Sequence, residues 1–392
     1  MKIKIVILLL ICFSMSGCFN YREINDLAIL TAIGIDKKEN NYNVTLQIVN
    51  TQLKSQNINN TNNPDFYTYT FEGATIQEAL RNMIKSSPKR TYGNHLKILL
   101  ISEEIAKEGL NKGMDFFIRD SESEKQFLMV ISRNTSAKEI LETTTPLIQN
   151  NSQNIYNLIK SNDQYLSEDR GITLDQAMEI LLNDYQELTL PSIVLVKEED
   201  NQNNENENIK STDVASELMI SETGIFKQDK LIGYLSEEQE RSLLLLNNKG
   251  GKVILTEKCD NEGNLMSGEI TKYKTKININ ENTYDVNIKF NFALNQYNCN
   301  TDLDKKDNLK KIEKKIESKI KNDVLNSIYG IINTYDSDVF GFADLMYKNK
   351  YNYFNKFYNK SFLKSINFKL KVNINKISKG NELKSLKGAF YE

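Results

Sequence analysis

Short hydrophobic runs alternate with helix-like spacings through the first half of the chain. Six runs of continuous or alternating apolar residues have the length of strands: 27–35, 42–49, 66–71, 95–102, 127–132 and 188–196. Pro191 interrupts the last run. Because proline cannot donate a hydrogen bond to a neighbouring strand, we expect that strand at an edge of its sheet.

Helix-starting residues lie between several of these runs. The four expected N-caps are Thr75, Ser102, Ser136 and Thr173. Two of them precede Glu78 and Glu139 by the spacing of a capping box. After the first cap, one helix face carries Ile76, Ala79, Leu80, Met83 and Ile84. Since strands and helices alternate, the sequence predicts a mixed α/β fold of the α+β class over residues 18–197, whole or split in two.

The apolar pattern stops over residues 198–213. We expect a polar linker or loop there, because this segment cannot bury enough apolar surface to order itself. Residues 214–392 then predict a C-terminal α/β domain. Its expected strands are 217–227, 230–235, 253–256, 269–279, 283–294 and 366–374. The fourth and fifth flank a short polar turn and predict a hairpin. Ser236 is expected to cap a helix that ends at Gly250.

The longest predicted helix covers residues 302–336. Its narrow apolar stripe consists of Leu309, Ile312, Ile316, Ile320, Val324, Ile328 and Ile331. Such a stripe serves either as a coiled-coil seam for a partner helix or as the face that packs on the helix's own sheet. We expect the second arrangement, with the terminal strand 366–374 in the sheet that the helix covers.

The N-terminal segment has the order of a secretory signal. Lys2 and Lys4 precede nine apolar residues, and small residues then lead directly into Cys18. Residues 1–17 are therefore expected to be removed, which changes the formal net charge from −2 to −4. The segment before Cys18 resembles a bacterial lipobox, with Met15 in place of the usual leucine. The alternative is an ordinary signal peptide with an incidental cysteine.

A lipid anchor follows if Cys18 is acylated, because two or three acyl chains hold a protein on a membrane stably. No other stretch reaches 18 consecutive apolar residues, the length that spans a bilayer. We therefore expect a soluble body on the outer face of a membrane, tethered to lipid through Cys18.

Composition excludes several kinds of chemistry. Fifty Lys and Arg balance 52 Asp and Glu, so the chain has no overall attraction for nucleic acid. His95 is the only histidine, which rules out His-rich metal sites, and no phosphate-loop, dinucleotide, hydrolase or zinc-protease motif occurs. We predict no enzyme activity, no cofactor and no metal. Cys259 and Cys299 are left either as a disulfide or as two buried thiols.

Two further groups have ordinary structural interpretations. His95 follows a turn-like Gly93-Asn94 pair and is expected at the start of a strand, hydrogen-bonded to a neighbour. Arg119 and Asp120, near two glutamates, are expected to form a small solvated ion-pair network that contributes little to stability.

Several short motifs, taken in order, resemble the Ger(x)C family, the C-subunit lipoproteins of spore germinant receptors. After Cys18, the residues Arg22, Glu23, Ile24 and Asp26 match the family's Arg-Glu-Ile-x-Asp start, although Phe19 and Asn20 replace its Trp-Asp. The segment around His95 resembles the family's Tyr-Gly-His-x-Lys strand with one residue shifted, and Arg119-Asp120 resembles its Arg-Asp segment. Later, Asp338-Val-Phe-Gly-Phe342 resembles its Asp-x-Phe-Gly segment.

The resemblance implies a non-catalytic subunit on the outer face of the spore inner membrane. It implies two integral-membrane partner subunits, of the A and B types, that complete a nutrient receptor. It also implies a three-domain α/β body with a long helix on the last sheet. The family's motifs mark fold and assembly, so no residue that binds a nutrient directly is carried over. A free-standing solute-binding lipoprotein is the alternative, and an extracytoplasmic enzyme would need a convergent pair of acids.

Overall fold

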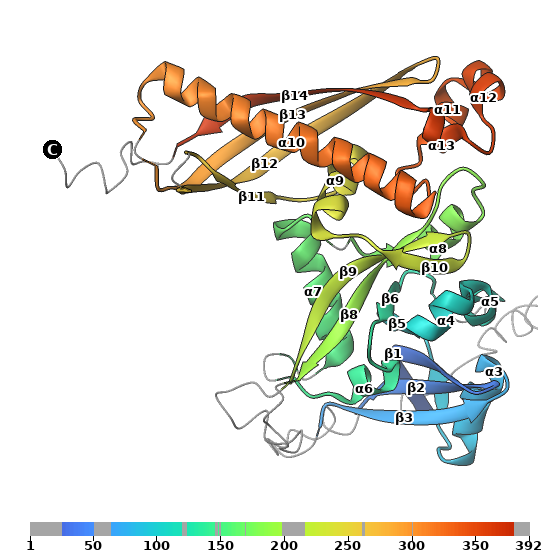
Figure 1. Ribbon diagram of the computed structural model, residues 1–392. Helices are drawn as coiled ribbons and strands as arrows, with labels where there is room; N and C mark the ends of the chain where they lie inside the picture. Colours follow the sequence, from blue (N-terminus) through green and yellow to red (C-terminus); the bar gives the residue numbers. More distant parts are fainter. Residues whose placement is uncertain are drawn as a thin grey trace, which may run out of the picture.

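The structure is a computed structural model that describes residues 26–50, 64–119, 124–145, 148, 150–168, 170–197, 216–260, 263–299 and 301–379 (Figure 1). The predicted signal peptide 1–17, residues Cys18, Arg22, Glu23, Ile24 and Asp120, and the predicted linker 198–213 lie outside the described residues. The fold is of the mixed α/β type that the sequence predicts, with two mixed sheets and helices on their faces.

The first sheet has ten strands in the described part of the chain. They are β1 (Leu27–Lys38), β2 (Asn41–Val49), β3 (Phe66–Gly73), β4 (Arg90–Tyr92), β5 (Ile98–Ser102), β6 (Leu128–Ser132), β7 (Ile172–Thr173), β8 (Thr189–Lys197), β9 (Ser216–Lys227) and β10 (Lys230–Tyr234). The main path is β10-β9-β8-β6-β5-β1-β2-β3, and the four central strands β8, β6, β5 and β1 run parallel. Parallel neighbours are joined by helical crossovers, as the alternating pattern predicts.

Helices cover both faces of this sheet because its central strands are apolar on both sides. In β5, Leu99 and Ile101 face one core and Ile98 and Leu100 the other. The helices that pack into the first core are α3 (Ile76–Asn82), α4 (Glu103–Glu108), α5 (Leu110–Arg119) and α8 (Leu174–Leu181). Those that pack into the second are α6 (Ala137–Glu142) and α7 (Asn151–Tyr165).

The expectation that the strand containing Pro191 lies at an edge is wrong. β8 lies inside the sheet, parallel to β6 on one side and antiparallel to β9 on the other. The pairing with β9 shifts register between Leu190 and Ser192, so the proline occupies an irregularity where no ladder donor is required.

Strands from both sides of the predicted linker belong to the first sheet. β9 and β10 form a hairpin, and β9 pairs with β8. The turn between β9 and β10 also contacts the junction of α4 and α5, where the Leu110 N–H donates to the Asp229 carbonyl at 2.8 Å. At this contact Gly109 has φ +130°, and a Cβ there would lie 2.7 Å from the Asp229 carboxylate, so the close approach requires glycine.

The second sheet, with order β11-β12-β13-β14, consists of β11 (Val253–Lys258), β12 (Leu265–Asn280), β13 (Thr283–Tyr297) and β14 (Asn367–Ser378). α9 (Glu237–Asn247) leads into it from β10. The helices after β13 are α10 (Lys306–Tyr335), α11 (Phe342–Asn349), α12 (Tyr351–Phe357) and α13 (Phe362–Ser365). β14 pairs parallel with β13, because the chain crosses over through α10 before it returns.

The long helix packs on its own sheet, as expected. Its apolar stripe shares one core with β12, β13 and β14, and Figure 1 shows α10 lying along them. Ile316, Val324 and Ile328 in this stripe are fully buried. Within the described residues, the stripe is therefore used by this chain itself, and the coiled-coil alternative is not needed.

Three local expectations need correction. His95 lies in a turn, and the strand begins only at Ile98. Ile84 is 61% exposed because α3 ends at Asn82 and a 3-10 turn, η2 (Met83–Lys85), rotates it out of the apolar face. α9 ends at Asn247 rather than at Gly250, and its C-cap Asn248 adopts the left-handed conformation that glycine usually supplies.

Candidate functional site

The predicted site residues in the described part of the chain lie on the surface and do not form one cluster. Asp26 is exposed immediately before β1. His95 is exposed in the turn before β5, with its ring 6.1 Å from that of Tyr92. Arg119 is exposed at the end of α5 and pairs with Asp115 at 2.9 Å, one turn earlier in the same helix. Because the pair is local and exposed, it contributes little to stability.

A cavity lies beside Arg119. It has a volume of about 660 Å³ and opens between α3, η2, β4 and α5. Figure 1 shows α3 and α5 on its right side. We call it the α3–α5 groove. Its apolar wall comes from residues on those helices, chiefly Ile76, Leu80, Met83 and Phe116. Two of these are buried in the first core and two are half-buried, so the groove has an apolar wall and a solvent-facing rim.

The rim of the groove is strongly basic. Among the described residues that line it, the cationic ones are Arg81, Lys89, Arg90, Lys112 and Arg119, and the acidic one is Asp115. These residues bring a local charge of +4 to a chain whose total is −2. Such a concentration of one sign attracts groups of the opposite sign.

The groove lies where the described chain begins. Leu27, the first residue of β1, pairs with Arg90 in β4, and Ile29 pairs with Tyr92. No sequence pattern predicts this site, because its basic residues are spread over α3, the segment from η2 to β4, and α5. The Lys89-Arg90 pair just after Pro88 was the one local signal of it.

A second polar feature lies at Asp338, where the half of the molecule that contains the second sheet meets the half that contains the first. This side chain is 7% exposed, and its carboxylate accepts hydrogen bonds from the Phe342 and Ala343 N–H groups at 2.9 and 2.8 Å. It thereby satisfies two free donors at the N-terminus of α11. The Asp338 carbonyl accepts from the Glu187 N–H at 3.0 Å, which ties the segment to the loop before β8.

Two further hydrogen bonds join the segment after α10 to the first sheet. The Tyr335 hydroxyl donates to the Tyr234 carbonyl at 2.9 Å, and the Ser337 hydroxyl donates to the Phe226 carbonyl at 3.0 Å. Both acceptors lie on the β9–β10 hairpin. Residues 335–338, which lead into the family-like segment 338–342, therefore fix the second half of the molecule to the first sheet.

Burial dominates the titration of Asp338. It raises the pKa of this carboxyl to about 6, even though three backbone N–H groups oppose the shift. Asp36 in β1 uses the same arrangement, because its carboxylate accepts from the Ala137 and Lys138 N–H groups at 2.8 and 2.9 Å and burial raises its pKa as well. Asp36 caps a helix 101 residues later in the chain, whereas Asp338 caps α11, which begins four residues later. In both cases the buried acid has a structural use.

Other acids gather in a cleft of about 420 Å³ between α7, β9 and α9. Glu222 pairs with Arg133, and Glu168 pairs with Arg241 at 2.7 Å. Glu240 accepts a hydrogen bond from Thr223. Because these carboxylates are held by cations or hydroxyls, the arrangement is that of a structural network.

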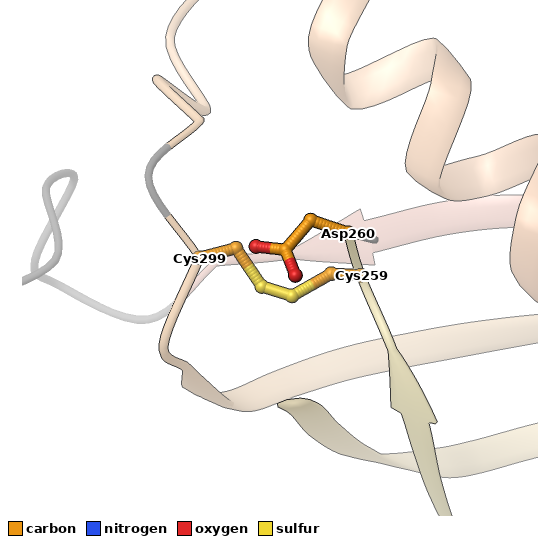
Figure 2. Close-up of side chains that lie close together, drawn as sticks. All are labelled: Cys259, Asp260 and Cys299. Atoms are coloured by element: carbon orange, nitrogen blue, oxygen red, sulfur yellow. A yellow bond between two sulfur atoms is a disulfide. The ribbon is translucent and has the colours of Figure 1, made fainter. Parts of the chain in front are cut away.

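The structure joins Cys259 and Cys299 in a disulfide, with Cα atoms 6.3 Å apart (Figure 2). The bond links the end of β11 to the segment after β13. The carboxylate of Asp260 lies beside it, and these three residues form the one group in the described part of the chain close enough to hold a metal ion. A disulfide offers no thiolate, so the oxidised pair does not supply the ligands that a zinc site uses.

Removing this disulfide is expected to destabilise the second half of the molecule. The bridge spans 40 residues, and for such a loop the Cys259→Ser, Cys299→Ser variant should lose about 2–4 kcal/mol of unfolding free energy. Urea titration of the mature chain with and without reductant measures the effect. Reductant should weaken the original chain and leave the double variant unchanged; equal midpoints in all four samples would show that the bond does not stabilise the fold.

No helix in the described ranges is long and apolar enough to cross a membrane.

Two family models match the chain in succession. The model described as "Spore germination protein N-terminal domain" matches residues 20–195, and the model described as "Spore germination B3/ GerAC like, C-terminal" matches residues 221–380. Together they cover most of the sequence, in the order in which the motifs were found.

Curated relatives and a solved structure agree with these matches. Spore germination protein KC of Bacillus subtilis (strain 168) is 26% identical over 278 residues, 69% of this chain and 68% of that protein. Spore germination protein B3 of the same organism is 24% identical over 283 residues, 70% of this chain and 68% of that protein. A crystal structure of the GerBC protein shares the fold, with a TM-score of 0.55 and 18% identity over 88% of this chain and 96% of that one.

Proposed function

This chain belongs to the family of GerAC-like spore germination proteins, and from that premise we propose that it is the non-catalytic C subunit of a nutrient germinant receptor. The observation that carries the proposal is the succession of the two family domains over residues 20–195 and 221–380. Relatives that carry "spore germination protein" in their names match about two thirds of their length to this chain.

The geometry supports an assembly role over a catalytic one. The buried acids Asp36 and Asp338 cap helices, and the acids of the α7–α9 cleft pair with arginines or a hydroxyl. Since these groups are engaged in holding the fold together, the chain is better suited to present surfaces than to transform a substrate.

The proposal includes a membrane location. Acylated Cys18 would hold residues 18–392 on the outer face of the spore inner membrane, beside two integral-membrane subunits of the A and B types. We place the N-terminal domain before the polar segment 198–213 and the C-terminal domain after it, with β9 and β10 crossing back to complete the first sheet. A free-standing solute-binding lipoprotein would need two lobes that close on a hinge, which the hydrogen bonds of Tyr335 and Ser337 across the junction do not favour.

Co-purification from spore membranes tests the assembly. In a gentle detergent, the tagged chain is expected to elute together with two proteins that each cross the membrane several times. Spores that lack the chain are expected to lose the response to at least one nutrient. A chain that elutes alone, from spores whose germination is unchanged by its deletion, would contradict the proposal.

A further inference from the structure

We propose that the α3–α5 groove is a docking surface for the anionic headgroups of phospholipids in the membrane that holds the chain. The inference rests on the proposed anchor at Cys18. It goes beyond that anchor, because it names the face of the folded body that contacts the membrane.

Charge is the first support. Four of the five cationic rim residues, namely Arg81, Arg90, Lys112 and Arg119, are exposed. The local charge of +4 stands on a body whose total becomes −4 once residues 1–17 are removed. An anionic membrane repels a body that is acidic overall. A basic face turned toward the membrane reverses this, because the membrane attracts each Lys or Arg that lies within about one Debye length of its surface.

The position of the anchor is the second support. Nine residue steps separate Cys18 from Leu27, and an extended chain spans at most about 3.3–3.6 Å per residue, or roughly 30 Å. Leu27 pairs directly with Arg90 on the rim. An acyl chain on Cys18 therefore keeps the groove within that reach of the headgroups, where a high effective concentration makes weak contacts productive.

The apolar part of the groove is the third support. Ile84 is 61% exposed beside the rim, and Leu80 and Phe116 are half-buried in the wall. Apolar side chains flanked by cations are typical of surfaces that lie in the membrane interface, because the cations meet the headgroup and the apolar groups meet the start of the acyl chains. A free phosphate or an acidic peptide would use the charges and leave Ile84 in water.

Vesicle flotation tests the proposal on the mature, unlipidated chain carrying Cys18→Ser. At low salt we expect binding to phosphatidylglycerol vesicles and none to phosphatidylcholine vesicles. The Arg81→Gln, Lys112→Gln variant should bind phosphatidylglycerol at least tenfold more weakly. A matched control, Lys274→Gln with Lys276→Gln, removes the same charge from exposed positions of β12 and should bind like the parent. Circular dichroism confirms that all three proteins keep the same thermal midpoint.

Several results would overturn the docking surface. They are no binding to phosphatidylglycerol, equal binding to both vesicle types, or an equal loss in the β12 control. Calorimetry gives two further contradicting results. Tight binding of soluble glycerol phosphate at the groove without vesicle binding would assign the site to a free anion, and tight binding of polyglutamate would assign it to an acidic protein.

Since the vesicle assay contains neither the lipid anchor nor the other receptor subunits, its failure leaves the proposed function untouched. Loss of co-purification, conversely, leaves the docking result standing.

Discussion

Replacing Asp338 by alanine is expected to lower the free energy of unfolding by about 2–6 kcal/mol. The substitution leaves the Phe342 and Ala343 N–H groups buried without an acceptor, and each unsatisfied buried donor costs about 1–3 kcal/mol. The same segment carries the contact between Asp338 and Glu187 that joins the two halves, so the loss should appear in both. Urea titration followed by tyrosine fluorescence measures it, because the chain has 19 tyrosines and no tryptophan.

A nearby acid provides the matched control. Asp336 lies two residues earlier, its side chain is 55% exposed, and its carboxylate is 3.7 Å from Lys227. Asp336→Asn should change stability by less than about 1 kcal/mol, as for other exposed ion pairs. Comparable losses in the two variants would mean that the Asp338 hydrogen bonds do not hold the junction.

Asp338 should also leave a signature in the pH dependence of stability. Its folded pKa of about 6 lies above the ordinary value of 3.8, so the folded state binds the proton more tightly than the unfolded state does. The contribution of protonated Asp338 to the free energy of unfolding is therefore fully present below about pH 4 and is lost as the pH rises through about 6. Relative to Asp338→Asn, which does not titrate, the original chain should gain up to about 3 kcal/mol between pH 7 and pH 4. A constant difference between the two proteins would contradict the assignment.

Much of the local structure follows from the sequence because short-range signals agree with the tertiary packing. The cap at Thr173 forms with Gln176 as a complete capping box, and the stripe of α10 faces its own sheet. The failure at Pro191 shows the limit of such signals. Proline removes one donor, but whether a strand lies at an edge depends on which distant segments pair with it, and here β9 pairs across a register shift.

The candidate site was less accessible to sequence reasoning. The groove draws its cations from α3, the loop to β4, and α5, and only the topology brings Arg81, Arg90 and Lys112 together. Asp338 was singled out only as part of a family-like segment, because nothing local shows that a carboxylate after α10 will be buried at a junction with the first sheet. His95 and Arg119 stand out in the sequence because each belongs to a short motif. In the structure, the His95 ring lies near that of Tyr92 and Arg119 pairs with Asp115, both on the surface.

Replacing Cys18 by alanine is expected to leave a chain without acyl groups, either released from the membrane or still carrying its uncleaved signal segment. The acyl chains attach through the Cys18 thiol, and each buried methylene contributes about 0.8 kcal/mol to membrane binding, so a released chain without them keeps only the weak contacts of the groove. Cys12 is the internal control, because Cys12→Ala lies within the predicted signal peptide and should leave the mature protein unchanged. Fractionation of the producing cells into membrane and soluble material measures the effect.

The most direct test of a lipid-held receptor subunit is the covalent state of Cys18 in protein purified from spore membranes. Mass spectrometry of the N-terminal peptide should show a chain that begins at Cys18 and carries acyl groups, and the Cys18→Ala variant should incorporate no labelled palmitate. An unmodified Cys18 in membrane-derived protein, or label retained by the alanine variant, would contradict the account.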